Sequence, residues 1–137
     1  MENKMKKLKI AADIKMLHKV LAFVDTQLEE NNCPMKAQMQ IDVALEELFV
    51  NIAHYAYREG KGEVEIKVKV TAEGVEITLT DSGIPYDPLA KPDPDVTLSA
   101  NKRAIGGLGI FMSKKLMDEL SYQYIDGKNN LTIKKRF

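Results

Sequence analysis

The sequence predicts an α+β fold, a two-layer α/β sandwich in which three helices cover one face of a mostly antiparallel sheet. Three observations lead to this prediction. Apolar residues recur at three- and four-residue spacing over residues 14–30 and 34–57, the pattern of amphipathic helices. They alternate with charged residues over 64–70 and 75–79, the pattern of strands with one buried face. A glycine-rich segment, 105–109, then opens a third helical pattern, which two short strand-like segments follow.

The N-terminal part of the chain is predicted to form a strand and then two helices. Residues 8–12 can form a short strand, and Asp13 can cap the helix that follows it. The apolar stripe of this helix runs to Glu30 and is broken by Asn31-Asn32. Pro34 suits the first turn of the second helix, because the N–H group that proline lacks has no helical partner there.

The C-terminal part is predicted to contain two hairpins, with a long loop and the third helix between them. The first hairpin turns at residues 72–74. Four of the five prolines fall in the loop that follows, residues 84–103, which is long enough to act as a functional lid. Strands over 122–125 and 131–135, joined by residues 126–129, close the chain. This order of elements fits one domain over residues 1–137.

The composition fits a globular domain and argues against several other classes of protein. Lys and Arg number 20 and Asp and Glu number 20, so the formal charge is zero, unlike that of a dedicated nucleic-acid binder. The single cysteine, Cys33, excludes an intrachain disulfide and a cysteine-cluster metal site. The chain has no run of about 18 apolar residues for a membrane span, and its N-terminus is too polar for a signal peptide. We therefore expect a cytoplasmic protein.

The second predicted helix carries a polar strip beside its apolar stripe. At about 100° per residue, its members fall within about 60° of one another: Glu47, Asn51, His54 and Arg58. An Asn oxygen is a ligand that Mg²⁺ accepts among waters and phosphate oxygens. A Glu one turn earlier could order a water or take a proton from an attacking hydroxyl. The alternative is an ordinary solvated helix face.

A second candidate site lies at the end of the first hairpin, at Asp81-Ser82-Gly83. Counted back by twos, Asp81 continues the buried face of Val75, Ile77 and Leu79. A carboxylate on that face needs a partner, and the exocyclic amine of a nucleobase is a suitable donor. Gly83 would let the backbone approach a flat ligand closely. The alternative is that the strand ends at Thr80 and the three residues form only a turn.

A third candidate site is the glycine cluster at the start of the last predicted helix. Gly106, Gly107 and Gly109 leave backbone N–H groups exposed at a helix N-terminus, where phosphate binds readily. The alternative is a hinge or a helix cap. The chain lacks the GxxxxGK[ST] pattern of a P-loop and the motif set of eukaryotic-type protein kinases.

The order and context of the three motifs resemble those of the Bergerat-fold ATPases. This superfamily includes the ATPase domains of gyrase, heat-shock chaperones, histidine kinases and mismatch-repair proteins. The resemblance spans almost the whole chain. Within this superfamily, the chain is most similar to the bacterial anti-sigma factor serine/threonine kinases. The similarity lies in its compact length and in two segments, Ile84-Pro85-Tyr86-Asp87-Pro88 and Gly107-Leu108-Gly109-Ile110-Phe111-Met112.

The resemblance implies ATP and Mg²⁺ as cofactors and a role for each motif residue. Asn51 matches the magnesium-binding Asn, and Glu47 matches the catalytic base four residues before it. Asn130 falls near a position where relatives have a Thr that assists adenine binding. The residues matched to the nucleotide are, in chain order, Asn51, Asp81, Gly83, Gly106, Gly107, Gly109 and Asn130.

Two features depart from the pattern of the kinases. They commonly have a His four residues after the Asn, whereas His54 is one position early, which turns it about 100° around the helix. The loop also has no Arg directly before its glycines, because Ala104 and Ile105 intervene. Lys102 and Arg103 are therefore candidates for a contact with the γ-phosphate.

The resemblance implies a protein that binds a sigma factor and uses Mg-ATP to phosphorylate a Ser or Thr of an anti-sigma-factor antagonist protein. It implies no direct nucleic-acid or membrane partner, and a homodimer stays open. Two other functions also stay open: an ATP-gated regulator that binds its partner without catalysis, and an ATP-binding domain that serves a histidine kinase in trans. The presence of Glu47 favours the enzyme.

Overall fold

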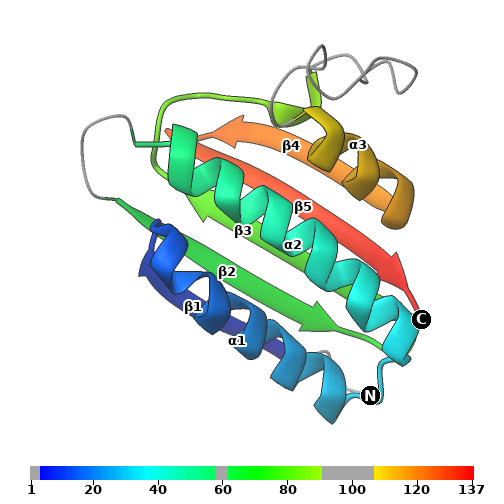
Figure 1. Cartoon of the computed structure of the whole chain (residues 1–137). Helices are drawn as coiled ribbons and strands as arrows, with labels where there is room; N and C mark the ends of the chain where they lie inside the picture. The colour runs from blue at the N-terminus through cyan, green and yellow to red at the C-terminus, as the bar shows by residue number, and fades with distance from the viewer. Residues whose placement is uncertain (1–3, 58–61, 91–106) are drawn as a thin grey trace.

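Three α-helices cover one face of a five-stranded antiparallel sheet in the described part of the chain (Figure 1). The structure is a computed structural model that describes residues 4–57, 62–90 and 107–137. Two short 3₁₀ turns, η1 (Ile14–Met16) and η2 (Pro88–Ala90), accompany the main elements. The helices and strands are β1 (Lys4–Ala11), α1 (Leu17–Glu30), α2 (Met35–Tyr55), β2 (Glu63–Val70), β3 (Gly74–Asp81), α3 (Gly107–Leu116), β4 (Glu119–Ile125) and β5 (Lys128–Arg136). The predicted α+β class is confirmed.

The sheet order is β1-β2-β3-β5-β4, and every neighbouring pair is antiparallel. The last strand therefore lies inside the sheet, between β3 and β4, rather than at its edge. Its register places Asn129 opposite Asp81 and Asn130 opposite Thr80. This pairing brings the C-terminal end of β3 and the N-terminal end of β5 together, next to the C-terminal end of α2.

The core lies between the sheet and the helices and follows the predicted periodicities. On β2, alternate residues from Val64 to Val70 are buried, and on β3 the same alternation includes Asp81. From the helix side, α2 contributes the largest share, with Phe49 completely buried among its neighbours. α2 is the central helix of the layer and packs against both α1 and α3. It can therefore carry side chains to contacts with either helix.

Three element boundaries differ from the prediction because hydrogen bonds override the local pattern. Asp13 accepts a hydrogen bond from the backbone N–H of Lys15 at 2.9 Å and so caps the 3₁₀ turn, while α1 begins only at Leu17. β1 extends back to Lys4 because it pairs with β2 along its whole length. α2 ends at Tyr55, and the carbonyl of Ala56 accepts from the backbone N–H of Ile84 at 2.9 Å instead of from a further helical turn.

The turn between β4 and β5 is shorter than the predicted four residues. Asp126 and Gly127 alone connect the strands, with φ of 52° and 76°. Two consecutive residues with positive φ are typical of the tight type I′ turn, which matches the twist of a hairpin. The prediction that Asn130 precedes the last strand is therefore wrong, because β5 begins at Lys128 and includes Asn129 and Asn130.

Some predicted features lie outside the described residues. These are Arg58, most of the loop 84–103, Lys102 and Arg103 within it, and Gly106. Among the described residues, no helix combines the length and the apolar character needed to cross a membrane.

Two carboxyl groups meet at the contact between α1 and α2. Asp25 of α1 and Asp42 of α2 each have their Oδ1 atom removed from solvent, without a hydrogen-bond partner among the described residues. Burial, the Asp25 carboxyl group and the charge of Glu29 raise the pKa of Asp42 to about 8. The protonated form of Asp42 can donate a hydrogen bond to Asp25, and the pair then holds the two helices together without repulsion.

We expect this pair to make the stability of the protein fall as pH rises from about 4 to about 8. Folded Asp42 keeps its proton until about pH 8, whereas the unfolded residue loses it near pH 4, so folding takes up a proton between these values. Asp42→Asn should remove this dependence and raise the free energy of unfolding at pH 8 by about 1 kcal/mol, a value reduced for the solvent screening of a half-exposed group. Urea unfolding from pH 5 to 8 measures both effects.

The control for this experiment is Asp126→Asn, the same substitution in an exposed turn. It should keep the wild-type pH dependence. Equal pH dependence in the wild type and in Asp42→Asn would show that the carboxyl pair does not control stability.

Candidate functional site

Asn51 lies between the two parts of the candidate site, Glu47 near the start of α3 and Asp81 at the end of β3. It lies on the last part of α2, and only 8% of the residue is exposed. Its side-chain Nδ2 donates to the backbone carbonyl of Glu47 at 2.9 Å and to the Glu47 carboxylate at 3.3 Å. No group in the described part of the chain donates to its Oδ1. This oxygen is therefore left as an acceptor for a ligand or a metal ion.

Glu47 lies against the start of α3. A side-chain carbon added to Gly109 would lie only 2.0 Å from the carboxyl carbon of Glu47, so the absence of a side chain on α3 makes room for this carboxyl group. Burial raises the pKa of Glu47, the hydrogen bond from Asn51 opposes that shift, and the charge of Glu46 adds to it. The net shift brings the carboxyl group closer to the range of a useful general base.

Asp81 forms the other half of the site. It ends β3 on the buried face, as the two-residue period predicts, and only 4% of it is exposed. Its Oδ1 accepts two hydrogen bonds, from the backbone N–H of Gly83 at 2.9 Å and from Asn129 Nδ2 at 2.9 Å. In the described residues no donor reaches its Oδ2, which stays free to accept from a ligand.

Gly83 fixes the chain after β3 against the end of α2. A side-chain carbon there would lie 2.2 Å from the carbonyl oxygen of Ala56. The next residue, Ile84, donates its backbone N–H to that same oxygen at 2.9 Å. Glycine is therefore required for the approach of two backbones, which closes one wall of the site.

A small pocket, partly open to solvent, lies between these groups. Asn51 and Asp81 both line it, together with Asn129. Its other walls carry mainly apolar and aromatic side chains, namely Ile52, Tyr55, Ala56, Ile84, Tyr86, Pro88 and Leu131. The rings of Tyr55 and Tyr86 lie 5.9 Å apart. A flat apolar ligand that presents an N–H donor to Asp81 fits this chemistry.

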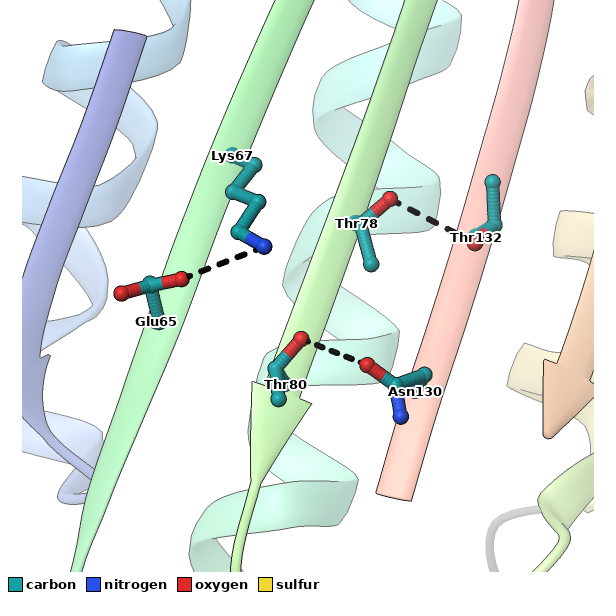
Figure 2. A network of polar contacts seen from close by, with 6 residues as sticks. All are labelled: Glu65, Lys67, Thr78, Thr80, Asn130 and Thr132. Atoms are coloured by element: carbon teal, nitrogen blue, oxygen red, sulfur yellow. Dashed lines mark hydrogen bonds and ion pairs between the residues drawn. The ribbon is translucent and has the colours of Figure 1, made fainter. Parts of the chain in front are cut away.

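The structure does not bring Asn130 to the pocket. Its side chain lies on the opposite face of the sheet, where its Oδ1 accepts from the Thr80 hydroxyl at 2.9 Å (Figure 2). Thr78 and Thr132 make a similar contact on this outer face, at 3.4 Å. The neighbouring Asn129, which the sequence analysis missed, points inward instead. The sequence pattern that could have identified Asn129 is the two-residue alternation, which puts it on the same face of the strand as the buried Leu131 and Ile133.

The remaining predicted residues are placed as follows. His54 is exposed on α2, and its ring lies edge-on to that of Tyr55, 6.0 Å away. Gly107 begins α3, the helix whose third residue, Gly109, lies against Glu47. The helix and strand motifs that are far apart in the sequence are thus brought to one place: Asn51 is hydrogen-bonded to Glu47 and lines the same pocket as Asp81.

The donor set fits a purine nucleotide and a magnesium ion. Asp81 Oδ2 and Asn51 Oδ1 each lack a donor among the described residues, and both residues line the same pocket. A carboxylate suits the exocyclic amine of a base, and a neutral amide oxygen suits Mg²⁺. The first turn of α3 has backbone N–H groups without helical partners, which suit phosphate oxygens.

This fold and this arrangement of groups define a nucleotide-binding domain of the ATPase class. Residues 10–135 match the histidine kinase-like ATPase domain family, and the chain belongs to this family.

Individual relatives are bacterial protein kinases. Serine/threonine-protein kinase BtrW of Bordetella bronchiseptica is 27% identical over 99 residues, which cover 72% of this chain and 70% of BtrW. Serine-protein kinase RsbW of Listeria monocytogenes is 27% identical over 92 residues, 64% of this chain and 59% of that protein. RsbW of Bacillus cereus is 28% identical over 96 residues, 67% of this chain and 60% of that protein. The chain therefore covers less than two thirds of the length of these two RsbW proteins.

A solved structure shares the fold. The RsbU and RsbW domains of a protein from Mycobacterium tuberculosis match with a TM-score of 0.66 at 18% sequence identity. The match covers 96% of this chain and 32% of that one. At this identity the similarity shows the fold alone.

Proposed function

We propose that this protein is a cytoplasmic anti-sigma regulatory factor that uses Mg-ATP to phosphorylate a Ser or Thr of an anti-sigma-factor antagonist protein. The observation that carries the proposal is the position of the Glu47 carboxyl group. It is hydrogen-bonded to Asn51 at 3.3 Å and lies against Gly109 at the start of α3. The names of the relatives, serine and serine/threonine protein kinases, support the same reaction.

Glu47 acts as the base in the proposed transfer. The hydroxyl oxygen of the antagonist forms a bond to the γ-phosphorus of ATP, and the bond between that phosphorus and the bridging oxygen of ADP breaks. The hydroxyl proton passes to the Glu47 carboxylate, whose pKa burial raises, which makes it a stronger base than an exposed carboxylate. Phosphorylated antagonist and ADP are the products.

The other site residues bind and orient the nucleotide. Asp81 Oδ2 accepts from the exocyclic amine of adenine, and the apolar walls of the pocket contact the ring. Asn51 Oδ1 would bind Mg²⁺, which neutralises charge on the phosphates. The N-terminal turn of α3, together with Gly106 before it, would donate N–H groups to the phosphate oxygens.

The experiment that tests this function incubates the protein with γ-labelled ATP and a candidate anti-sigma-factor antagonist protein from the same organism. Label on a Ser or Thr of the antagonist is the expected result. ATP-dependent binding of the antagonist or of a sigma factor without label would instead favour the gated regulator. Label that appears only on a histidine kinase added in trans would favour the detached ATP-binding domain.

Asn51→Ala should weaken the binding of Mg-ATP but leave the binding of adenosine nearly unchanged. It removes the amide oxygen offered to Mg²⁺, so Mg-ATP should bind about 10-fold more weakly or worse, while adenosine should bind nearly as in the wild type. Calorimetry with and without Mg²⁺ measures this. Asn130→Ala, on the outer face of the sheet, is the matched control. Equal Mg-ATP affinity in both variants and the wild type would remove Asn51 from the magnesium site.

A further inference from the structure

Asn129 has the densest set of hydrogen bonds around the candidate pocket. It is 4% exposed and lies at the N-terminal end of β5, directly opposite Asp81. Its Nδ2 donates to Asp81 Oδ1 at 2.9 Å and to the carbonyl of Ile84 at 2.8 Å. Its Oδ1 accepts from the backbone N–H of Tyr86 at 3.2 Å and from the Tyr122 hydroxyl. The one side chain thus joins β3, the segment after it, β4 and β5.

These partners leave the amide only one orientation. The Asp81 and Ile84 oxygens face its NH₂ group and the Tyr86 N–H faces its oxygen, so a flipped amide would meet like with like at these three contacts. The Tyr122 hydroxyl, which can donate or accept, donates to the amide oxygen in the observed orientation. Tyr122 contributes to this without touching the ligand space, because it lies on β4 and is not among the residues that line the pocket. One of the groups that orient the amide, the Tyr122 hydroxyl, therefore lies outside the pocket.

We propose that Asn129 is a positioning residue that engages one oxygen of Asp81 and thereby presents only the other, Oδ2, to the base of the bound nucleoside. Asp81 Oδ1 already accepts from Gly83 and Asn129, which uses its two lone pairs. A single oriented acceptor selects a ligand with an amine at that point, as adenine has at C6, where guanine has a carbonyl oxygen. The proposal rests on the proposed function for the identity of the base.

Asn129→Asp tests the proposal through a pH profile. The substitution keeps the shape but replaces the NH₂ group by a carboxyl oxygen next to that of Asp81. The two groups can coexist there only while they share a proton. Adenosine affinity should approach that of the wild type near pH 5 and then fall by up to about tenfold per pH unit, to a loss of about 100-fold by pH 8. A residue that only filled space would not produce this slope.

The neighbouring Asn130→Asp is the matched control, because it makes the same change one residue away on the outer face of the sheet. The other titratable groups near the pair in the described residues include Tyr57, Tyr86, Asp87, Tyr122 and Tyr124, and they are common to both variants. Asn130→Asp should therefore bind adenosine with the pH dependence of the wild type. Calorimetry with adenosine from pH 5 to 8.5 compares the proteins without phosphate or Mg²⁺.

Tyr122→Phe provides a second measurement that stands if Asn129→Asp does not fold. It removes the hydroxyl that donates to the Asn129 amide oxygen, and it changes none of the residues that line the pocket. Adenosine should bind about 3- to 10-fold more weakly, the range for one neutral hydrogen bond. Affinity equal to that of the wild type would overturn the proposal.

The outcomes separate this proposal from the kinase function. If Asn129→Asp shows the same pH profile as Asn130→Asp, the positioning role is overturned and the kinase function stands. If the wild type binds adenosine and Asn129→Asp shows the predicted slope, but no phosphoryl transfer occurs, the kinase function fails and the positioning role stands. A wild-type protein that binds no adenosine overturns both.

Discussion

Glu47→Gln is expected to lower phosphoryl transfer to the antagonist by about 10²- to 10⁴-fold while nucleotide and partner binding stay close to wild type. The substitution keeps the length of the side chain and an oxygen for the hydrogen bond from Asn51. It removes only the ability to accept a proton. The rate of label appearing on the antagonist, compared with the calorimetric affinity for ATP, measures the two properties separately.

The adjacent carboxylate provides the control for this prediction. Glu46 has the same chemistry but points about 100° away from Glu47 on α2 and is exposed. Glu46→Gln should therefore leave both transfer and binding almost unchanged, apart from the small loss of its charge effect on Glu47. Transfer rates that are equal in the wild type and in both variants would remove the base role from Glu47.

Asp81→Asn should weaken adenosine binding by about 10- to 100-fold and reduce the discrimination against guanosine. A hydrogen bond to a charged group contributes about 1.5–3 kcal/mol, and each 1.4 kcal/mol is a factor of ten in affinity. The new amide can still accept from Gly83 and Asn129 through its oxygen, so its NH₂ group would face the base. That group repels the amine of adenine and can donate to the carbonyl of guanine.

The control is Asp118→Asn, which makes the same substitution near the far end of β5. Asp118 accepts there from the backbone N–H of Arg136, a bond that an amide oxygen can also accept. Its adenosine affinity should match that of the wild type. If Asp81→Asn keeps full affinity and full preference for adenosine, Asp81 does not recognise the base, and the proposed nucleotide site loses its main specificity contact.

Several site positions could be predicted from the sequence because they depend on one element at a time. The four-residue step from Glu47 to Asn51 places the two side chains one helical turn apart, and the structure shows them hydrogen-bonded. The two-residue step from Val75 places Asp81 on the buried face of β3, and the residue is buried there. Gly109 was predicted at the start of a helix and lies in its first turn.

The sequence alone leaves one choice open: Asn129 belongs either to the last strand, where it shares the inward face of Leu131 and Ile133, or to the turn before it. The choice depends on how many residues form the turn before β5, and Asp126-Gly127-Lys128-Asn129 is compatible with a turn of two or of four. A shift of one residue moves a side chain to the other face of a strand. Pairing of β5 with both β3 and β4 selects the two-residue turn and so directs Asn129 inward.

The sequence by itself determined the fold class and the faces of the helices and strands, because the repeat of an α-helix or a β-strand is a property of the local backbone. Only the tertiary structure decided which of those faces meet. The contact of Glu47 with Gly109 and the pairing of Asp25 with Asp42 join residues on different elements. Such contacts depend on strand register and helix packing, in which a shift of one position exchanges every partner, and no local pattern encodes that choice.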